Sequence, residues 1–335
     1  MRDELNTSFD CFGSSCGAYV AGEGQESSAR AALALVRREL LAWHARFSRF
    51  LPGSELSLLN GDPRWEVPAS AMMIRFAQAV REAGSLTGGL VDATLVDQIE
   101  RAGYTEDLRH PLSLARALKL APARKPAAAA IAAGWQQLEV DLAHSTIARP
   151  PGIKLDSGGL AKGLFADVLA ERLSSHASFA INCAGDLAIG GAGEIVRPIN
   201  VESPFDGRNL HTFHLRRAGI ATSGVGRRSW LDARGHPAHH LLDPASGEAA
   251  FTGIVQVTAL APSALRAEIY AKAAILSGPQ AARSWLAHGG VIVFDDGSHE
   301  AIEPRCTTID PPPKITLSEL SAFAQPIAMH GVEAG

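Results

Sequence analysis

The sequence predicts an α+β fold in which helices pack on mixed, mostly antiparallel sheets. Two features of the 335-residue chain favour this class. Segments with apolar residues near the helical period dominate the first third, and short alternating segments separated by turns fill much of the remainder. The chain shows no internal repeat, so a solenoid or propeller is not expected.

The first third begins with a predicted hairpin over residues 8–22, where a Gly/Ser turn joins two short strands. A helix is expected over 27–47, because apolar residues recur near the helical period and a serine at its start can cap it. The following elements are a loop with a helical turn over 48–60, a helix over 69–86, a segment over 87–104 that begins as a glycine turn and continues as a helix, and an Ala/Pro-rich, partly helical connector over 106–134.

Short strands and turns dominate the rest of the chain. Strands are predicted in WQQLEVD, STIARP, FAINCAG, DLAIGG, PINVES, TFHLR, GIATSG, SWLDAR and HHLLDP. A glycine turn and helix lie within KLDSGGLAKGLFADVLAERL, and the last elements are a strand over 253–260, helices over 262–277 and 280–287, and a strand over 290–294. The tail beyond residue 303 contains PPP and little periodicity, so we expect it to be loosely attached or extended.

The composition argues against nucleic-acid and membrane partners. The 31 Lys and Arg nearly balance the 35 Asp and Glu, and aromatic residues make up only 6% of the chain. No apolar run approaches the roughly 20 residues of a membrane span, and the polar N-terminus lacks the pattern of a signal peptide. We therefore expect a cytoplasmic protein without a membrane span. The four cysteines (Cys11, Cys16, Cys183 and Cys306) match neither a disulfide framework nor a zinc template, so free thiols are expected.

Residues 157–163, SGGLAKG, combine a glycine turn with the start of a predicted helix. They lack the spacing of a dinucleotide-binding or Walker loop. Glycines let the backbone approach a ligand, and the first N–H groups of a helix favour phosphate, to which Lys162 can add a charge. The alternative is a strand-to-helix turn with a solvated lysine, and the spacing alone leaves both interpretations open.

Two further segments carry candidate chemistry. In HHLLDPASG, His240 can act as a base oriented by Asp243, or it can be a core histidine while Asp243 starts a turn. In SALRAEIYAKAAILSG, Glu268 and Lys272 stand at i and i+4 on a predicted helix. They form either a surface ion pair worth about 0.3 kcal/mol or, given the surrounding alanines and isoleucine, a partly buried site.

Taken jointly, five blocks resemble the FAD:protein FMN transferases, the ApbE-like flavin transferases. The blocks are FGSSCGAYV, SRFLPGSELSLLN, GGLVDATL, LDSGGLAKGLFAD and the combination of IATSG, HHLLDPASG and VTALAPSALRAEIYAKAAILSG. The resemblance implies a T-fold-like α+β domain over residues 10–302, with an N-terminal extension over 1–9 and a C-terminal tail over 303–335.

The resemblance also implies a reaction. Such enzymes bind FAD with Mg²⁺, cleave its pyrophosphate, attach FMN to a Thr or Ser hydroxyl of a target protein through a phosphoester, and release AMP. FAD is therefore the expected substrate, Mg²⁺ the expected metal, and an acceptor flavoprotein the expected partner.

Single residues receive roles from the same resemblance. Phe12 takes the place of a family methionine that lies against the flavin, where its ring can stack. His240 is the best candidate for the base on the acceptor hydroxyl, and the expected catalytic residues are His240, Asp243 and Glu268. The residues expected to bind FAD are Phe12, Asp92, Thr94, Gly158, Gly159, Ala161, Lys162, Ser223, His240 and Lys272. The expected metal ligands are the backbone carbonyl of Ala161 and the carboxylate of Glu268.

The last block departs from the family pattern. Glu268 and Lys272 stand where the family has an aspartate and a threonine that ligate the metal. A glutamate can still bind Mg²⁺, but an ammonium has no lone pair and can only occupy the cation position itself. The pair therefore marks a metal-independent transferase, a weakened enzyme, or an FAD-binding relative without transfer activity.

Three functions follow from these observations. We expect an FAD:protein FMN transferase. The alternatives are a protein that binds FAD without chemistry and an FAD pyrophosphatase, in which water replaces the acceptor hydroxyl.

Overall fold

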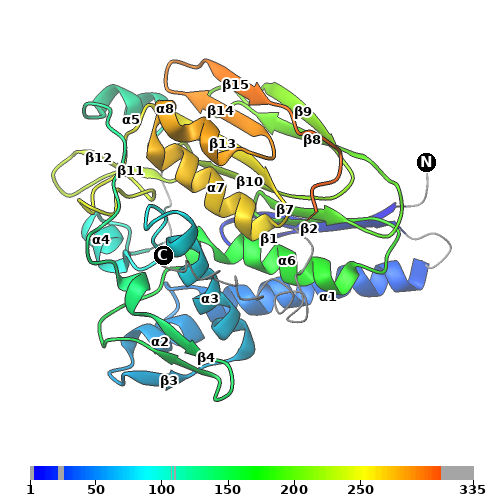
Figure 1. The fold of residues 1–335 in the computed structure, drawn as a ribbon, viewed down its shortest axis with the longest axis horizontal. Helices are drawn as coiled ribbons and strands as arrows, with labels where there is room; N and C mark the ends of the chain where they lie inside the picture. Colours follow the sequence, from blue (N-terminus) through cyan, green and yellow to red (C-terminus); the bar gives the residue numbers. More distant parts are fainter. Residues whose placement is uncertain (1–3, 22–25, 107, 109–110, 311–335) are drawn as a thin grey trace, which may run out of the picture.

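A computed structural model describes residues 4–21, 26–106, 108 and 111–310, and it confirms the α+β class (Figure 1). Its central sheet has eight strands. From one edge to the other they are β1 (Glu4–Cys11), β2 (Ser14–Ala21), β6 (Phe179–Cys183), β7 (Asp186–Gly190), β10 (Ala218–Gly224), β13 (Ile254–Ala261), β14 (Gly290–Phe294) and β15 (His299–Ile302). Every neighbouring pair in this sheet is antiparallel.

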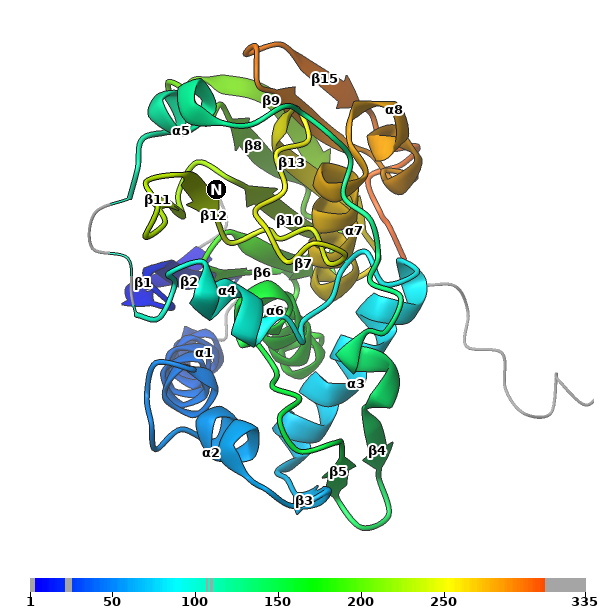
Figure 2. The ribbon, with the colours of Figure 1, turned by 90° about the vertical axis from the view of Figure 1, so that its left-hand side faces the viewer.

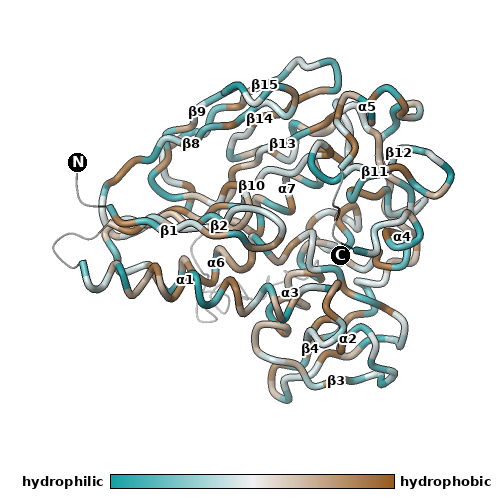
Figure 3. The backbone as a smooth tube through the Cα atoms, turned by 180° about the vertical axis from the view of Figure 1, so that it is seen from behind, coloured by the Kyte–Doolittle hydropathy of each residue, from teal (hydrophilic) through white to brown (hydrophobic). Residues whose placement is uncertain are grey.

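The long helices are α1 (Glu26–Phe47), α3 (Ala71–Leu86), α6 (Ala161–Leu173) and α7 (Ala264–Ser277). Helix α6 packs on β6 and β7, α7 packs on β10 and β13, and α1 packs on the β1–β2 hairpin (Figure 1). Bands of hydrophobic and hydrophilic residues alternate along α1, which buries Val36, Leu40 and Phe47 against the sheet and α6 (Figure 3). This amphipathic pattern explains why the helix was predictable with nearly correct ends.

Smaller elements surround this framework. The short helices are α2 (Glu55–Gly61), α4 (Val96–Arg101), α5 (Leu114–Leu120) and α8 (Pro279–Ala282), with 3₁₀ turns η1 (Gly134–Gln137), η2 (Ser157–Gly159) and η3 (Arg283–Trp285). The remaining strands are β3 (Glu66–Pro68), β4 (Glu139–Asp141) and β5 (Thr146–Ala148) in one sheet, the hairpin of β8 (Arg197–Glu202) and β9 (Asn209–Leu215), and the hairpin of β11 (Ser229–Leu231) and β12 (Pro237–His239). Figure 2 shows β3, β4, β5 and α2 at the opposite end of the molecule from β15.

A second, small core lies beside the main one. Tyr104 stacks on Trp230 with ring centroids 5.1 Å apart, and Ile99, Ala238 and Leu242 are the other buried residues of this cluster. The indole N–H of Trp230 donates to the Ala102 carbonyl at 2.6 Å. These contacts hold the end of α4 against β11 and β12, and so form one wall of the pocket described below.

The segment 87–104 begins as a glycine turn and continues as a helix, as predicted, but its helical part is only α4, and residues 91–95 between the two are not helical. Oδ1 of Asp92 accepts hydrogen bonds from the amide and the hydroxyl of Thr94, at 2.8 and 2.5 Å. The Ala93 carbonyl accepts from the amide of Asp156 at 2.8 Å. This segment is therefore a turn tied to a distant loop, because local side-chain bonds compete with the helix.

Two other predicted elements also differ. The strand predicted in HHLLDP ends at His239, because Asp243 begins a turn in which its carbonyl accepts from the amide of Gly247 at 2.8 Å. The helix predicted over 280–287 is shorter and continues as η3.

The structure adds residues to both ends of the expected domain. Residues 4–9, expected as an extension, form most of β1 and pair with β2. At the other end, the amide of Ile309 donates to the Arg217 carbonyl at 2.8 Å, so the chain is anchored as far as residue 310. The rest of the expected tail, 311–335, lies outside the described residues. No helix in the described ranges is both long and apolar enough to cross a bilayer.

Candidate active site

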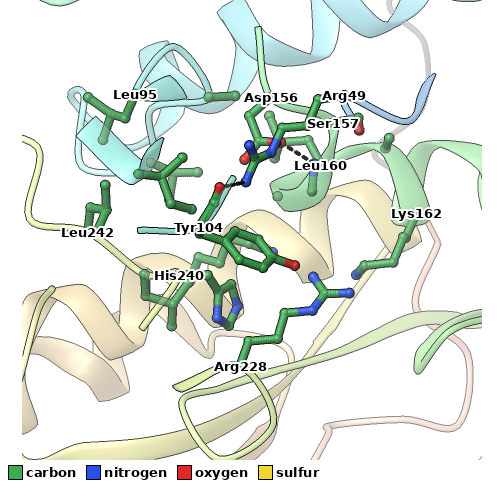
Figure 4. Close-up of a pocket in the computed structure, with 18 of the residues that line it drawn as sticks. Arg49, Leu95, Tyr104, Asp156, Ser157, Leu160, Lys162, Arg228, His240 and Leu242 are labelled. Carbon is green, nitrogen blue, oxygen red and sulfur yellow. Dashed lines mark hydrogen bonds and ion pairs between the residues drawn. The ribbon is translucent and has the colours of Figure 1, made fainter. Parts of the chain in front are cut away.

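A pocket opens between the two cores, next to the glycine turn that precedes α6 (Figure 4). Its lining includes the apolar side chains Phe12, Phe47, Phe50, Leu90, Leu95, Ile99, Tyr104, Leu241, Leu242 and Leu276. Its polar lining includes Arg49, Asp92, Asp156, Lys162, Arg228, His240 and Lys272. A concave apolar site with a few convergent polar groups is typical of small-molecule binding.

The SGGLAKG segment forms the turn that the sequence predicts. Oδ1 of Asp156 accepts from the amide of Gly158 at 3.0 Å, and the hydroxyl of Ser157 donates to the Phe47 carbonyl at 2.6 Å. A Cβ at Gly159 would lie 3.5 Å from Cε of Lys272. The turn thus brings bare backbone and the start of α6, with its favourable dipole for anions, directly over a buried lysine.

Four charged side chains meet beneath this turn. Oε1 of Glu268 accepts hydrogen bonds from the ammonium groups of both Lys162 and Lys272, each at 3.0 Å. Its Oε2 accepts from the amide of Gly163, also at 3.0 Å, while Lys162 donates in addition to Asp186. Glu268 is fully buried and Asp186 is 1% exposed, whereas both lysines also line the pocket.

His240 lies at the pocket with an unused ring nitrogen. Its side chain points toward the same space as those of Arg228 and Lys162 (Figure 4). Nδ1 of His240 is buried and has no hydrogen-bond partner among the residues that the structure describes. The Arg228 guanidinium donates to the Phe12 carbonyl at 3.4 Å, which links the β1–β2 turn to this group.

The sequence profile of the ApbE family matches residues 12–294, which include all of these groups. The chain belongs to the ApbE family. It is 28% identical over 236 residues to the FAD:protein FMN transferase of Salmonella typhimurium, an alignment that covers 68% of this chain and 65% of that protein. It is 25% identical over 283 residues to the FAD:protein FMN transferase of Klebsiella pneumoniae, covering 80% of this chain and 77% of that one.

The fold is likewise that of a solved ApbE protein. The crystal structure of the ApbE protein from Thermotoga maritima superposes with a TM-score of 0.72 at 22% identity, covering 90% of this chain and 97% of that one. The comparison confirms the fold expected from the resemblance.

Within this ApbE-family chain, most residues expected to bind FAD lie together. Those that line the pocket are Phe12, Asp92, Gly158, Gly159, Ala161, Lys162, His240 and Lys272. Thr94 and Ser223 do not belong to the lining. Thr94 instead orients Asp92, and the Ser223 hydroxyl lies 3.5 Å from the Lys272 ammonium.

Two of the expected catalytic residues do not line the pocket. Asp243 uses Oδ1 to accept from the amides of Ala128 and Ala245, at 2.9 and 3.2 Å, and Oδ2 to accept from the Ser246 hydroxyl at 2.8 Å. These bonds give it the turn-forming role that the sequence left open. Glu268 is buried below the lining and contacts the pocket through the two lysines.

The charged groups perturb one another's pKa values. Burial and the charge of Glu268 raise the pKa of Asp186 to about 7, against the effect of Lys162. Burial also disfavours ionised Glu268, but Lys162 and Lys272 outweigh it and hold the pKa of that carboxyl below its usual value. Burial lowers the pKa of Lys272, whereas for Lys162 the carboxylates of Asp186 and Glu268 outweigh burial and raise the pKa.

The side chains present do not fit the Mg²⁺ site that the resemblance implied. Mg²⁺ requires free oxygen ligands in near-octahedral geometry. Both oxygens of Glu268 are already acceptors, and the group that stands beside it is an ammonium. Within the described ranges, no group of three or more His, Cys, Asp or Glu side chains could hold a metal ion. Of the two expected ligands, Ala161 lines the pocket, but Glu268 is committed to the lysines.

Sequence reasoning missed Arg49 and Tyr104. The guanidinium of Arg49 lies over the rings of Phe50 and Tyr104, at 4.3 and 4.8 Å from their centroids, and donates to the Tyr104 carbonyl at 2.6 Å. It also lies 3.7 Å from Oδ1 of Asp156, so it joins the small core to the glycine turn. Arg49 stands inside the matched block SRFLPGSELSLLN, which was the available signal, but no pattern links it to residue 104.

Proposed function

We propose that this protein is an FAD:protein FMN transferase. It binds FAD in the pocket, transfers FMN to a Thr or Ser hydroxyl of an acceptor flavoprotein, and releases AMP. The observation that carries the proposal is the pair of ammonium groups beneath a glycine turn, that of Lys272 buried and that of Lys162 half-buried, at the edge of an aromatic pocket in a chain of the ApbE family.

The two parts of the pocket suit the two parts of FAD. The ring of Phe12 offers a surface on which a flavin can stack, while Phe50 and Tyr104, which already contact Arg49, add apolar area to the pocket wall. The ammonium groups of Lys162 and Lys272 and the start of α6 attract the pyrophosphate, because their positive charge lies in a largely desolvated site.

The reaction exchanges one phosphorus–oxygen bond for another. The acceptor oxygen forms a bond to the phosphorus of the FMN half, and the bridging P–O bond breaks so that AMP leaves with the bridging oxygen. The hydroxyl proton passes to a base. Positive charge held beside the pyrophosphate stabilises the transition state, as in other phosphoryl transfers.

His240 is the proposed base. Burial, Arg228 and His239 hold its pKa well below the usual value, so the imidazole is neutral at pH 7 and can accept a proton. The negative charge of bound pyrophosphate raises the basicity of the ring when substrate is present. Glu268 is bound to two ammonium groups and Asp243 to its turn, so neither competes for this role.

The cytoplasm is the proposed compartment, and no nucleic-acid partner is proposed. All four cysteines are free, and Cys11, Cys16 and Cys183 are buried, which suits a reducing compartment. The nearly balanced charge of the chain supports a protein acceptor over a nucleic acid.

A product assay tests the proposed function. The purified protein is incubated with FAD, with and without a candidate FMN-acceptor domain, and the nucleotides are separated while the acceptor is weighed by mass spectrometry. We expect AMP and a mass gain equal to FMN only when the acceptor is present. Intact bound FAD would make the protein a binding module, and free FMN without acceptor would make it a pyrophosphatase.

A further inference from the structure

The cluster of Lys162, Asp186, Glu268 and Lys272 under the glycine turn places ammonium groups where the resemblance implied a metal ion. Lys162 and Lys272 balance Glu268 and Asp186 when all four side chains are ionised, and the cluster carries one net positive charge when Asp186 is protonated. Asp186 contacts Lys162, and burial together with the charge of Glu268 raises the pKa of Asp186 to about 7. Arg228, at the pocket wall, adds a further cation on the ligand side.

Both lysines have donor capacity left for a ligand. An ammonium has three N–H donors. Within the described part of the chain, Lys272 donates to Glu268 at 3.0 Å and more weakly to Ser223 at 3.5 Å, and Lys162 donates to Glu268 and Asp186. Each side chain also lines the pocket, so a remaining donor is available to an anion there.

The position of Lys272 is fixed from several sides. It stands one helical turn after Glu268 on α7, and Glu268 is itself held by the amide of Gly163 at the start of α6. Gly159 leaves room for the lysine, since a Cβ there would lie 3.5 Å from Cε of Lys272. The cation is therefore preorganised between two helices and the turn.

We propose that the ammonium of Lys272, paired with that of Lys162 through Glu268, replaces a divalent cation, so that this protein binds FAD and transfers FMN without Mg²⁺. The inference rests on the proposed function for the transfer step, but its FAD-binding part stands independently. The acceptor oxygen attacks phosphorus and AMP leaves as described above, and the two ammonium groups stabilise the charge on the pyrophosphate oxygens. The exchange of P–O bonds is complete with FAD and the acceptor hydroxyl alone, and it needs no oxidant or further reactant.

The test compares the wild type with variants at one position, in excess EDTA and across a Mg²⁺ titration. Lys272→Thr removes the ammonium and places an oxygen beside Glu268. Lys272→Met removes the ammonium without adding a ligand. Lys119→Thr, at an exposed position on α5, is the matched control. Thermal melting of each variant establishes that it is folded.

For the wild type and Lys119→Thr, we expect the transfer rate to be the same in EDTA and in Mg²⁺. Lys272→Thr should lose at least about tenfold in EDTA and recover activity as Mg²⁺ is added. Lys272→Met should lose activity under both conditions. If wild-type activity disappears in EDTA and returns with Mg²⁺, the inference is wrong.

FAD affinity, measured by flavin fluorescence without any acceptor, separates the inference from the proposed function. We expect the wild-type Kd to be independent of Mg²⁺ and the Kd of Lys272→Thr to fall when Mg²⁺ is added. A wild type that transfers no FMN under any condition but shows this pattern overturns the proposed function alone. A wild-type Kd that falls at least about tenfold with Mg²⁺ overturns the inference, whatever the transfer assay gives.

Discussion

The ammonium of Lys272 donates to Oε1 of Glu268 across 3.0 Å, one turn apart on α7, and the same oxygen accepts from Lys162. An i, i+4 pair on a solvated helix face contributes little to stability. Here Glu268 is fully buried and keeps two like charges together. The pair is therefore part of a site, and its loss has consequences for both stability and ligand binding.

Removing the charge of Glu268 should destabilise the fold strongly. In Glu268→Gln, the ammonium groups of Lys162 and Lys272 lose the buried carboxylate that balances their charge, and removing one partner of a buried pair costs about 3–5 kcal/mol. Glu171→Gln on α6 is the control, because Glu171 pairs with Arg75 at the surface, where a salt bridge contributes about 0–1 kcal/mol. Denaturant unfolding of both variants measures the two costs, and similar costs would show that the cluster does not need its carboxylate.

Asp186 should make stability depend on pH. Its pKa is raised from 3.8 to about 7 in the folded chain, so the folded state binds the proton more tightly than the unfolded state. The resulting contribution to stability is fully present below the unfolded pKa and is lost as the pH rises through about 7. The unfolding free energy of Asp186→Asn should therefore rise relative to that of the wild type as the pH increases from 3.8 to about 7.

Denaturant unfolding at several pH values checks this prediction. The control is Asp97→Asn, which removes a carboxylate from the surface, where it pairs with Lys154. A difference between Asp186→Asn and the wild type that does not change with pH would contradict the prediction.

The extent to which this site could be predicted depends on how local each feature is. The glycine turn, Lys162 and the spacing of Glu268 and Lys272 are sequence-local, and all lie where the pattern places them. Asp186 comes from β7, in the predicted strand DLAIGG, and nothing in that strand marks it as the partner of Lys162. Tertiary pairing alone brings it to the site.

The same distinction holds for the fold. Helix α1 follows from apolar periodicity and the hairpin β1–β2 from its Gly/Ser turn, and both signals act over neighbouring residues. Between the predicted glycine turn and α4, the bond from the Asp156 amide to the Ala93 carbonyl holds the chain as a turn, so the helix is shorter than the sequence suggests. That contact joins segments that lie far apart in the sequence, and so no local pattern contains it.

Gly163 should be intolerant of a side chain. A Cβ there would lie 2.7 Å from the Ala264 carbonyl oxygen and 2.8 Å from Cα of Leu265, both backbone atoms of α7. Gly163→Ala therefore forces α6 and α7 apart, which costs about 1–3 kcal/mol as overpacking, and it displaces the amide that holds Glu268. Denaturant unfolding and FAD titration should both show a loss, whereas Gly53→Ala, in open space, should show neither.

His240 should be needed for transfer more than for binding. If its unpartnered Nδ1 accepts the acceptor proton, His240→Gln loses about 10²–10⁴-fold in kcat, while the lysines that hold FAD remain in place. Single-turnover transfer and FAD titration measure the two effects, and His236→Gln, at an exposed position, is the control. A loss confined to FAD affinity, with kcat unchanged, would assign His240 to substrate binding and leave the base elsewhere in the pocket, with Asp92 next in order. Asp92 lines the same pocket, and burial raises the pKa of its carboxyl against the effect of Thr94, so the transfer rate of Asp92→Asn would then test that carboxyl as the base.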